Sequence, residues 1–187
     1  CPRCGTTLSN FEVNQGYKDI KDIAVTVKLP LLDDGGEVTD TSLLVWTTTP
    51  WTLPGNMAAA VHNETDYVKV SVKGEEGEEL VILAKGRLEQ LGDLEHEVVE
   101  EMKGADLVGK SYEPPFSYWK DKEFEGKENA WKIYHADYVE IGEEGTGAVH
   151  LAPAYGADDM KLAKAEGVPI EHHVGESGHF KDVVTDF

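Results

Sequence analysis

Short apolar segments that recur at close intervals constrain the fold of this chain more than any other feature of its sequence. Several of them are rich in β-branched or aromatic residues, and turn-forming Gly, Pro or Asp residues lie between them, a pattern typical of β-strands. The predicted strands cover residues 22–29, 42–47, 57–61, 67–72, 80–83, 131–139 and 148–151. The first strand is expected to end at Pro30, because proline has no N–H to donate to a ladder.

Few helices accompany these strands. Residues 84–91 form a short helical stretch, and residues 157–166 have helical composition ahead of Gly167, a common C-terminal stop. Residues 96–103 fit a strand or a helix, and residues 113–129 are rich in Pro, Phe and charge, which predicts a surface excursion. The sequence therefore predicts a mainly β fold with peripheral helices (α+β), as a closed or nearly closed β-barrel. A parallel α/β sheet is the less favoured alternative.

Charge and hydropathy exclude two classes of partner. The 187 residues are enough for one domain with a substantial core, and they carry a net charge of −19. Proteins that bind nucleic acid through its phosphates present a basic face, so we expect no DNA binding and only weak autonomous binding to RNA. No apolar run approaches the roughly 18 residues of a membrane span. Without a signal peptide, the chain is expected to be cytoplasmic and to have no membrane partner.

Both cysteines of the chain lie at its start, where Cys1 and Cys4 form a CxxC motif followed by Gly5. This motif is typical of half a zinc ribbon, and zinc takes four ligands. We therefore expect the partner cysteines outside this sequence and a structural zinc only in a longer parent protein. A redox pair is the weaker alternative, because no βαβ unit accompanies the motif. Residues 1–16 are predicted to be the half zinc knuckle and its lead-in segment, and residues 17–187 the main domain.

A threonine-rich turn follows the predicted strand at residues 42–47. Pro50 biases the preceding residue toward an extended conformation, so the strand should end there. A rigid turn then presents a row of hydroxyl groups that can hydrogen-bond a small polar substrate. The alternative is a purely structural strand end, since threonine favours strands. The hydroxyls belong to Thr47, Thr48, Thr49 and Thr52.

A second segment combines flexible backbone with titratable side chains. Gly145 and Gly147 permit close backbone approach before a strand that carries His150. Asp158 and Asp159 lie in the first turn of the helix that follows. Adjacent helical residues point about 100° apart, so one carboxylate can cap the helix while the other faces a pocket. The alternative is that both only complement the positive end of the helix.

Together, these segments resemble the editing domain of isoleucyl-tRNA synthetase. The matching motifs are residues 47–56, 145–150 and 156–159, and residues 1–13 resemble the lead-in to that domain. The related valyl and leucyl domains have an arginine after the threonine pair, whereas this chain has Thr49 followed by Pro and Trp, the isoleucyl pattern. The resemblance spans essentially the whole chain and identifies residues 17–187 with the editing domain.

The resemblance implies a hydrolase that removes valine from mischarged tRNA(Ile), and from valyl-adenylate as a further substrate. Valine and isoleucine differ by one methylene, which binding exploits for only about 1–3 kcal/mol, a limit illustrated by this very synthetase. The implied partners are the acceptor end of tRNA(Ile) carrying the wrong amino acid and the remainder of the parent synthetase. No adenylate-forming signature is present, so the chain itself should not aminoacylate tRNA.

The resemblance also assigns roles to single residues. Asp159 is the expected anchor of the substrate's α-ammonium group. His150 is the expected wall that excludes isoleucine, with a structural histidine as the alternative. Asn56 holds the adenosine or stabilises the loop. Thr48, Thr49 and Asp159 are the expected catalytic residues, and the pocket is lined by Thr47, Thr48, Thr49 and Thr52.

A covalent nucleophile is not expected, because threonine needs an adjacent base and the turn contains none. We therefore expect water to attack the ester, without a cofactor. The remaining histidines lack comparable context, and His172, His173 and His179 form only a weak metal pattern that fits the surface better. Two other functions stay open: a non-catalytic inserted binding or spacer domain, and a CxxC zinc module.

Overall fold

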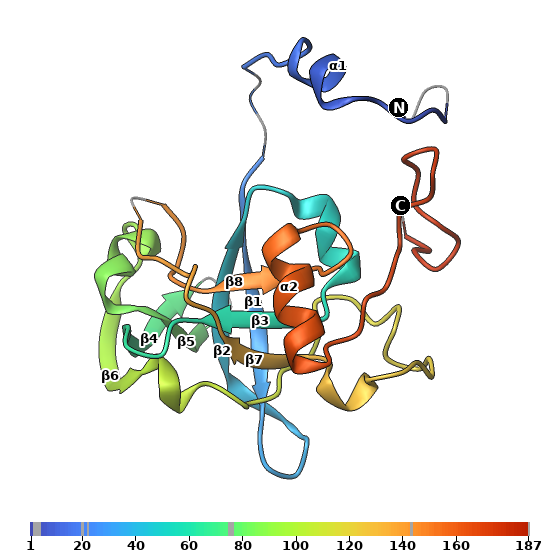
Figure 1. Ribbon diagram of the computed structural model, residues 1–187. Helices are drawn as coiled ribbons and strands as arrows, with labels where there is room; N and C mark the ends of the chain where they lie inside the picture. The colour runs from blue at the N-terminus through green and yellow to red at the C-terminus, as the bar shows by residue number, and fades with distance from the viewer. Residues whose placement is uncertain (2–4, 20, 22, 75–76, 143, 187) are drawn as a thin grey trace.

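The computed structural model describes residues 1, 5–19, 21, 23–74, 77–142 and 144–186. Its strands form a five-stranded sheet with the order β1-β2-β5-β4-β6 and a three-stranded sheet with the order β7-β3-β8 (Figure 1). Both sheets are mixed, since β2 pairs with β5 and β3 pairs with β7 in parallel. The predicted mainly β class is confirmed.

The five-stranded sheet begins with an antiparallel pair, β1 (Val25–Leu32) and β2 (Val38–Thr47). The expected end of the first strand at Pro30 is wrong, because the strand continues to Leu32 with a register irregularity after Pro30. β1 is an edge strand of this sheet, where a proline is tolerated because its missing N–H interrupts no central ladder.

The remaining strands of this sheet are β4 (Asp66–Gly74), β5 (Gly77–Ala84) and β6 (His96–Lys103). The last of these was ambiguous in the sequence and proves to be an edge strand paired with β4. The predicted helical stretch before it is a 3-10 helix, η2 (Lys85–Leu91). Its residue Leu91 packs on the outer face of the sheet, beside Val70 and Leu83.

The three-stranded sheet consists of β3 (Ala58–Val61), β7 (Lys132–His135) and β8 (Val149–Leu151). Every residue of β3 is buried, because hydrophobic side chains pack against both faces of this central strand. Ala59 and Val61 face the core between the sheets. Ala58 and Ala60 point to the other face of the sheet, where they pack with residues of helix α2 (Ala157–Glu166).

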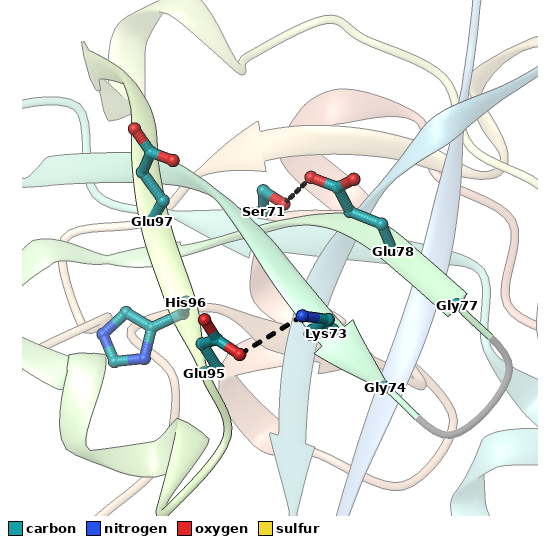
Figure 2. Close-up of a pocket in the computed structure, with 8 residues that line it drawn as sticks. All are labelled: Ser71, Lys73, Gly74, Gly77, Glu78, Glu95, His96 and Glu97. Carbon is teal, nitrogen blue, oxygen red and sulfur yellow. Dashed lines mark hydrogen bonds and ion pairs between the residues drawn. The ribbon is translucent and has the colours of Figure 1, made fainter.

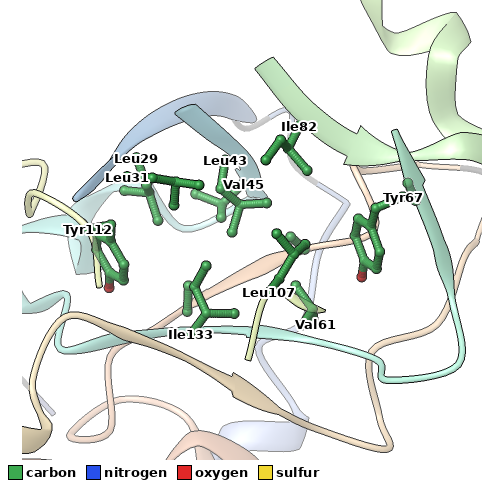
Figure 3. Close-up of a cluster of buried hydrophobic side chains, with 13 residues drawn as sticks. Leu29, Leu31, Leu43, Val45, Val61, Tyr67, Ile82, Leu107, Tyr112 and Ile133 are labelled. Atoms are coloured by element: carbon green, nitrogen blue, oxygen red, sulfur yellow. The ribbon is translucent and has the colours of Figure 1, made fainter. Parts of the chain in front are cut away.

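The main core lies between the two sheets (Figure 3). The five-stranded sheet contributes Leu29, Leu43 and Ile82, and the three-stranded sheet contributes Val61 and Ile133, all at most 2% exposed. Two backbone hydrogen bonds also join the sheets at one corner, through the segment 146–148. Isolated β-bridges also join the sheets at another place, where Tyr112 pairs with Leu31 of β1 and Ser111 pairs with Lys132 of β7. The ladders between the named strands stay within each sheet, so closure into a barrel is not confirmed. Two facing sheets already bury both inner surfaces without a closing ladder.

In the described part of the chain, two α-helices accompany the sheets. The predicted helix is confirmed as α2 (Ala157–Glu166), which ends at Gly167 in the left-handed conformation and packs on the three-stranded sheet (Figure 1). A second, short helix, α1 (Asn10–Asn14), was not predicted, although Ser9 and Glu12 form a capping box before and within it. α1 lies apart from the body of the protein (Figure 1). Among the described residues, no helix has the length and apolar character needed to cross a membrane.

Candidate functional site

A small cavity of about 260 Å³ lies where β2 ends, β8 ends and α2 begins. It is smaller than the roughly 300 Å³ at which sites for drug-sized ligands begin, so it suits a ligand as small as an amino acid. Six predicted site residues meet here although up to 112 positions separate them in the sequence. The predicted residues that line it are Thr47, Thr48, Thr49, Thr52, His150 and Asp159.

Three of the threonines, Thr47, Thr49 and Thr52, form a connected row of hydroxyl groups around the start of η1 (Pro50–Gly55), a 3-10 helix. The Oγ1 atoms of Thr47 and Thr49 lie 3.2 Å apart, and those of Thr49 and Thr52 lie 3.5 Å apart. Thr47 Oγ1 also accepts from the Thr49 backbone N–H at 3.1 Å. Thr48 and Thr49 are exposed, whereas Thr47 and Thr52 are buried. The row therefore leads from solvent into the interior.

His150 is fixed in one tautomer by this row. Thr52 Oγ1 lies 2.7 Å from the carbonyl oxygen of Thr49, which can only accept, so the single hydroxyl proton is used there. His150 Nε2, 2.9 Å from the same Oγ1, must then donate. Burial lowers the pKa of His150 to about 4, so its ring is neutral at physiological pH. Its Nδ1 is buried and has no hydrogen-bond partner among the described residues.

Asp159 lines the cavity from the first turn of α2. Its Oδ2 accepts the backbone N–H of Ala152 at 2.9 Å, and burial raises the pKa of this carboxyl group. Gly156 makes this geometry possible, since a Cβ there would lie 2.7 Å from Asp159 Cγ. Asp158, its neighbour, is exposed and does not line the cavity.

Ring N–H groups from the C-terminal half of the chain hold η1 in place. Trp119 Nε1 donates to the Pro54 carbonyl at 2.9 Å, and His173 Nε2 lies 2.9 Å from the carbonyl oxygen of Trp51. Two prolines remove backbone donors from this short helix, and its N-cap Thr49 makes no side-chain capping bond. Contacts from elsewhere in the fold therefore set its position.

Asn56 lies outside the cavity. Its Nδ2 donates to the Ala58 carbonyl at 3.0 Å, and its Oδ1 accepts from the Tyr112 hydroxyl at 2.8 Å. Its backbone carbonyl accepts from Trp131 Nε1 at 3.1 Å. These bonds match the loop-stabilising alternative that the sequence left open for this residue.

The glycine-rich segment before β8 has the close backbone approach that the sequence predicted. Gly145 and Gly147 have φ values of 85° and 79°, and a Cβ on Gly147 would overlap the side chain of Ala84. Arg87 is buried, and its Nε donates to the Gly145 carbonyl at 2.9 Å. A hollow of about 470 Å³ runs along this segment and shares Trp46 with the threonine cavity.

A larger hollow, of about 660 Å³, lies away from this site at the β4–β5 hairpin and the start of β6 (Figure 2). Four of its polar side chains pair with one another: Ser71 bonds Glu78 at 2.5 Å, and Lys73 pairs with Glu95 at 3.4 Å. This exposed edge lacks the convergent hydroxyl groups of the threonine cavity.

The predicted zinc half-site is only partly visible. Cys1 is half-buried and unbridged, but Cys4 lies outside the described residues, so this site stays a prediction. No group of three or more His, Cys, Asp or Glu residues that could hold a metal occurs in the described part of the chain.

Sequence reasoning missed part of the site and misplaced one residue. Trp46, Tyr155 and Gly156 also line the cavity. The expectation that His173 lies at the surface is wrong, because it is 0% exposed beneath η1. Only the tertiary fold brings it there, from 122 residues away, although its place beside an apolar segment, 168–170, was a signal for burial.

Known proteins share both the sequence and the fold. No protein-family model matches the chain. It is 46% identical over 185 residues to the isoleucine–tRNA ligase of Clostridium kluyveri and 41% identical over 184 residues to that of Clostridium tetani. It is 43% identical over 185 residues to that of Bdellovibrio bacteriovorus. These alignments cover 99%, 98% and 97% of this chain but only 16%, 16% and 17% of the relatives.

Two solved structures have a similar fold. A crystal structure titled GlLeuRS-CP1 matches with a TM-score of 0.59 at 16% identity, over 76% of this chain and 59% of that one. The P. knowlesi cytosolic leucyl-tRNA synthetase editing domain matches with a TM-score of 0.56 at 14% identity. The match covers 77% of this chain and 64% of that one. The chain therefore belongs to the isoleucine–tRNA ligase family, as a segment with the editing-domain fold.

Proposed function

We propose that this domain is an aminoacyl-tRNA deacylase that hydrolyses valine wrongly attached to tRNA(Ile). The observation that carries the proposal is the meeting of Asp159 with the threonine hydroxyls in one cavity of about 260 Å³. An aminoacyl ester presents an ammonium group, a small side chain and a carbonyl carbon open to water. The cavity offers an anion, a limited volume and several hydroxyl groups.

Asp159 binds the α-ammonium group of the substrate. Its Oδ2 accepts the Ala152 N–H, which orients the carboxylate. A charge-assisted hydrogen bond of this kind is about twice as strong as a neutral one. The ammonium group also favours the ionised carboxylate, against the burial that raises its pKa.

Thr47, Thr48 and Thr49 orient the attacking water and the ester. The water oxygen forms a bond to the carbonyl carbon, the ester C–O bond breaks, and the ribose oxygen leaves with one proton of the water. The amino acid is released as a carboxylate, and the second proton of the water passes to solvent. His150 is no general base here, because its Nε2 donates to Thr52 and its Nδ1 is buried. Positioning and orientation then supply most of the acceleration.

His150 forms the wall that limits the amino acid side chain. It is 8% exposed, lines the cavity, and is held rigidly by its bond to Thr52. A neutral, fixed ring excludes one further methylene by steric overlap. The hollow along the glycine-rich segment continues from this cavity past Trp46 and receives the terminal adenosine of the tRNA.

Deacylation of Val-tRNA(Ile) by the full-length synthetase that carries this domain tests the proposal. Asp159→Ala should slow valine release on the order of 100-fold, as expected for the loss of a positioning contact. Asp158→Ala, next to it but exposed, is the matched control and should retain the wild-type rate. Equal rates for the wild type and Asp159→Ala would leave a non-catalytic spacer domain as the explanation.

A further inference from the structure

His173 is a buried polar residue that no step of the proposed reaction uses. It is 0% exposed and follows α2 in the C-terminal segment. Its Nε2 lies 2.9 Å from the Trp51 carbonyl oxygen in η1. A carbonyl can only accept, so the proton of the neutral ring lies on Nε2.

The Trp51 carbonyl needs an outside donor for a reason that is visible in the sequence. In a 3-10 helix this oxygen would accept from the N–H three residues later, but that residue is Pro54, which has none. His173 supplies a donor where the helix lacks one. The adjoining residue, Thr52, carries the hydroxyl that bonds His150.

The same histidine also holds a second wall of the cavity. The Tyr155 hydroxyl accepts the backbone N–H groups of His173 at 2.8 Å and Val174 at 2.9 Å. The Tyr155 ring contacts His173 edge-on, with centroids 4.7 Å apart, and Trp51 edge-on at 5.4 Å. Tyr155 lines the cavity together with the threonines.

Gly55 completes this arrangement, since a Cβ there would overlap the His173 ring. His173 Nδ1 is buried without a hydrogen-bond partner among the described residues. An unpaired buried nitrogen is unfavourable, and an apolar side chain would fill the same space without that cost. The bond to η1 therefore explains why an imidazole occupies this position instead of an apolar side chain.

We propose that His173 is a positioning residue that clamps η1 to Tyr155 and so fixes the distance between two walls of the editing cavity. The clamp acts through the backbone of Trp51 and does not touch the substrate. This inference rests on the proposed deacylase function, because it assigns His173 a part in the same site.

The test compares His173→Leu and His173→Gln in the full-length synthetase, with Val-tRNA(Ile) as substrate. Leucine fills the space without a donor, whereas glutamine can return an N–H toward the Trp51 carbonyl. We expect His173→Leu to lower kcat on the order of 10-fold with little change in KM, because a misplaced site slows the reaction of bound substrate. His173→Gln should restore most of that loss.

Val184→Ala is the matched control, since Val184 is buried in the same C-terminal segment. It should lower stability without lowering kcat. Hydrogen exchange gives a readout that does not depend on activity. The amides of Thr52 and Asn56, which donate to the Thr49 and Leu53 carbonyls, should exchange faster in His173→Leu than in the wild type or in Val184→Ala.

Three results would contradict the clamp. A wild-type kcat in His173→Leu, while Asp159→Ala is inactive, overturns the clamp and leaves the proposed function intact. An equal loss of kcat in Val184→Ala shows that general destabilisation explains the effect. Equal deacylation by the wild type and Asp159→Ala overturns the proposed function and the clamp together.

Discussion

Gly156 and Asp159 share one small volume at the start of α2, and this shared volume can be tested directly. Gly156→Ala should slow Val-tRNA(Ile) deacylation on the order of 10-fold or more, because the new methyl group would lie 2.7 Å from Asp159 Cγ and displace the carboxylate. The backbone at Gly156 has φ −120° and ψ 133°, which alanine adopts freely, so the effect is steric.

Gly86→Ala is the control for this substitution, since its Cβ would meet only the Ile141 side chain, at 3.6 Å. It should retain the wild-type rate. A fully active Gly156→Ala enzyme would show that Asp159 does not need its observed position.

His150 makes a prediction about stability and pH. Its pKa is about 4 in the folded protein and 6.5 ordinarily, so between these values the unfolded chain binds a proton that the folded chain excludes. The stability contribution of the neutral His150 is therefore fully present above pH 6.5. As the pH is lowered toward 4, the free energy of unfolding falls by about 3 kcal/mol at most.

Urea unfolding from pH 7.5 to 4.5 of the wild type and His150→Gln measures this contribution. The difference between the two proteins should shrink as the pH falls. The raised pKa of Asp159 has the opposite pH dependence, but Asp159 is present in both proteins and largely cancels. A constant difference would mean that His150 has the same pKa in the folded and unfolded states and would contradict this prediction.

At the scale of single residues, the sequence predicted the polar part of the cavity and missed much of its frame. Sequence motifs predicted the threonines and the aspartate as site residues, and the structure brings Thr47, Thr52 and Asp159 together. Tyr155 and His173 lie outside these motifs, and their contacts are formed by segments that are distant in the sequence.

At the scale of elements, α2 depends on how it ends. Gly167 has φ 70°, and the N–H of Val168 returns to the Ala163 carbonyl at 2.9 Å. Gly167→Ala should lower the free energy of unfolding by about 1 kcal/mol, because an L-residue in this conformation brings its Cβ too close to the backbone. Gly167→Asn should lose less, since asparagine tolerates the left-handed region. Equal stability of all three proteins in urea unfolding would contradict this role.

Elements with strong local signals were predicted well from the sequence. Residues 157–166 have helical composition and a glycine stop, and α2 has those bounds. Residues 96–103 were ambiguous because strand β6 is exposed on both faces and shows no alternation of apolar and polar residues. The prediction that the first strand ends at Pro30 was wrong because β1 is an edge strand, where proline is tolerated. Whether a strand lies at an edge depends on the whole sheet and cannot be seen in the local sequence.

At the scale of the whole molecule, stability comes from the core between the two sheets. Ile133 is 0% exposed in this core, so Ile133→Ala should lower the free energy of unfolding by about 2–5 kcal/mol. Ile141→Ala, at a residue 46% exposed, is the control and should change it by no more than about 0.5 kcal/mol. Urea unfolding measures both changes. Similar losses in free energy of unfolding in the two variants would contradict the claim that the core between the sheets provides the stability.

The pairing of sheets marks the limit of prediction for the whole molecule. Alternating apolar segments predict strands, and their number predicts a mainly β fold. Whether the sheets close into a barrel depends on pairings such as the parallel one between β3 and β7, which join residues more than 70 positions apart. Strand patterns carry no information about such partners.

A structure of this domain with a non-hydrolysable valyl-adenosine analogue tests the central claim most directly. The ammonium group should lie within hydrogen-bond distance of the Asp159 carboxylate, with the valyl side chain against His150 and the ester carbonyl facing the threonine row. The adenosine should lie along the glycine-rich segment beyond Trp46. An analogue bound elsewhere, such as the hollow beside Lys73 and Glu95, or one bound with its amino group away from Asp159, would contradict the proposed site.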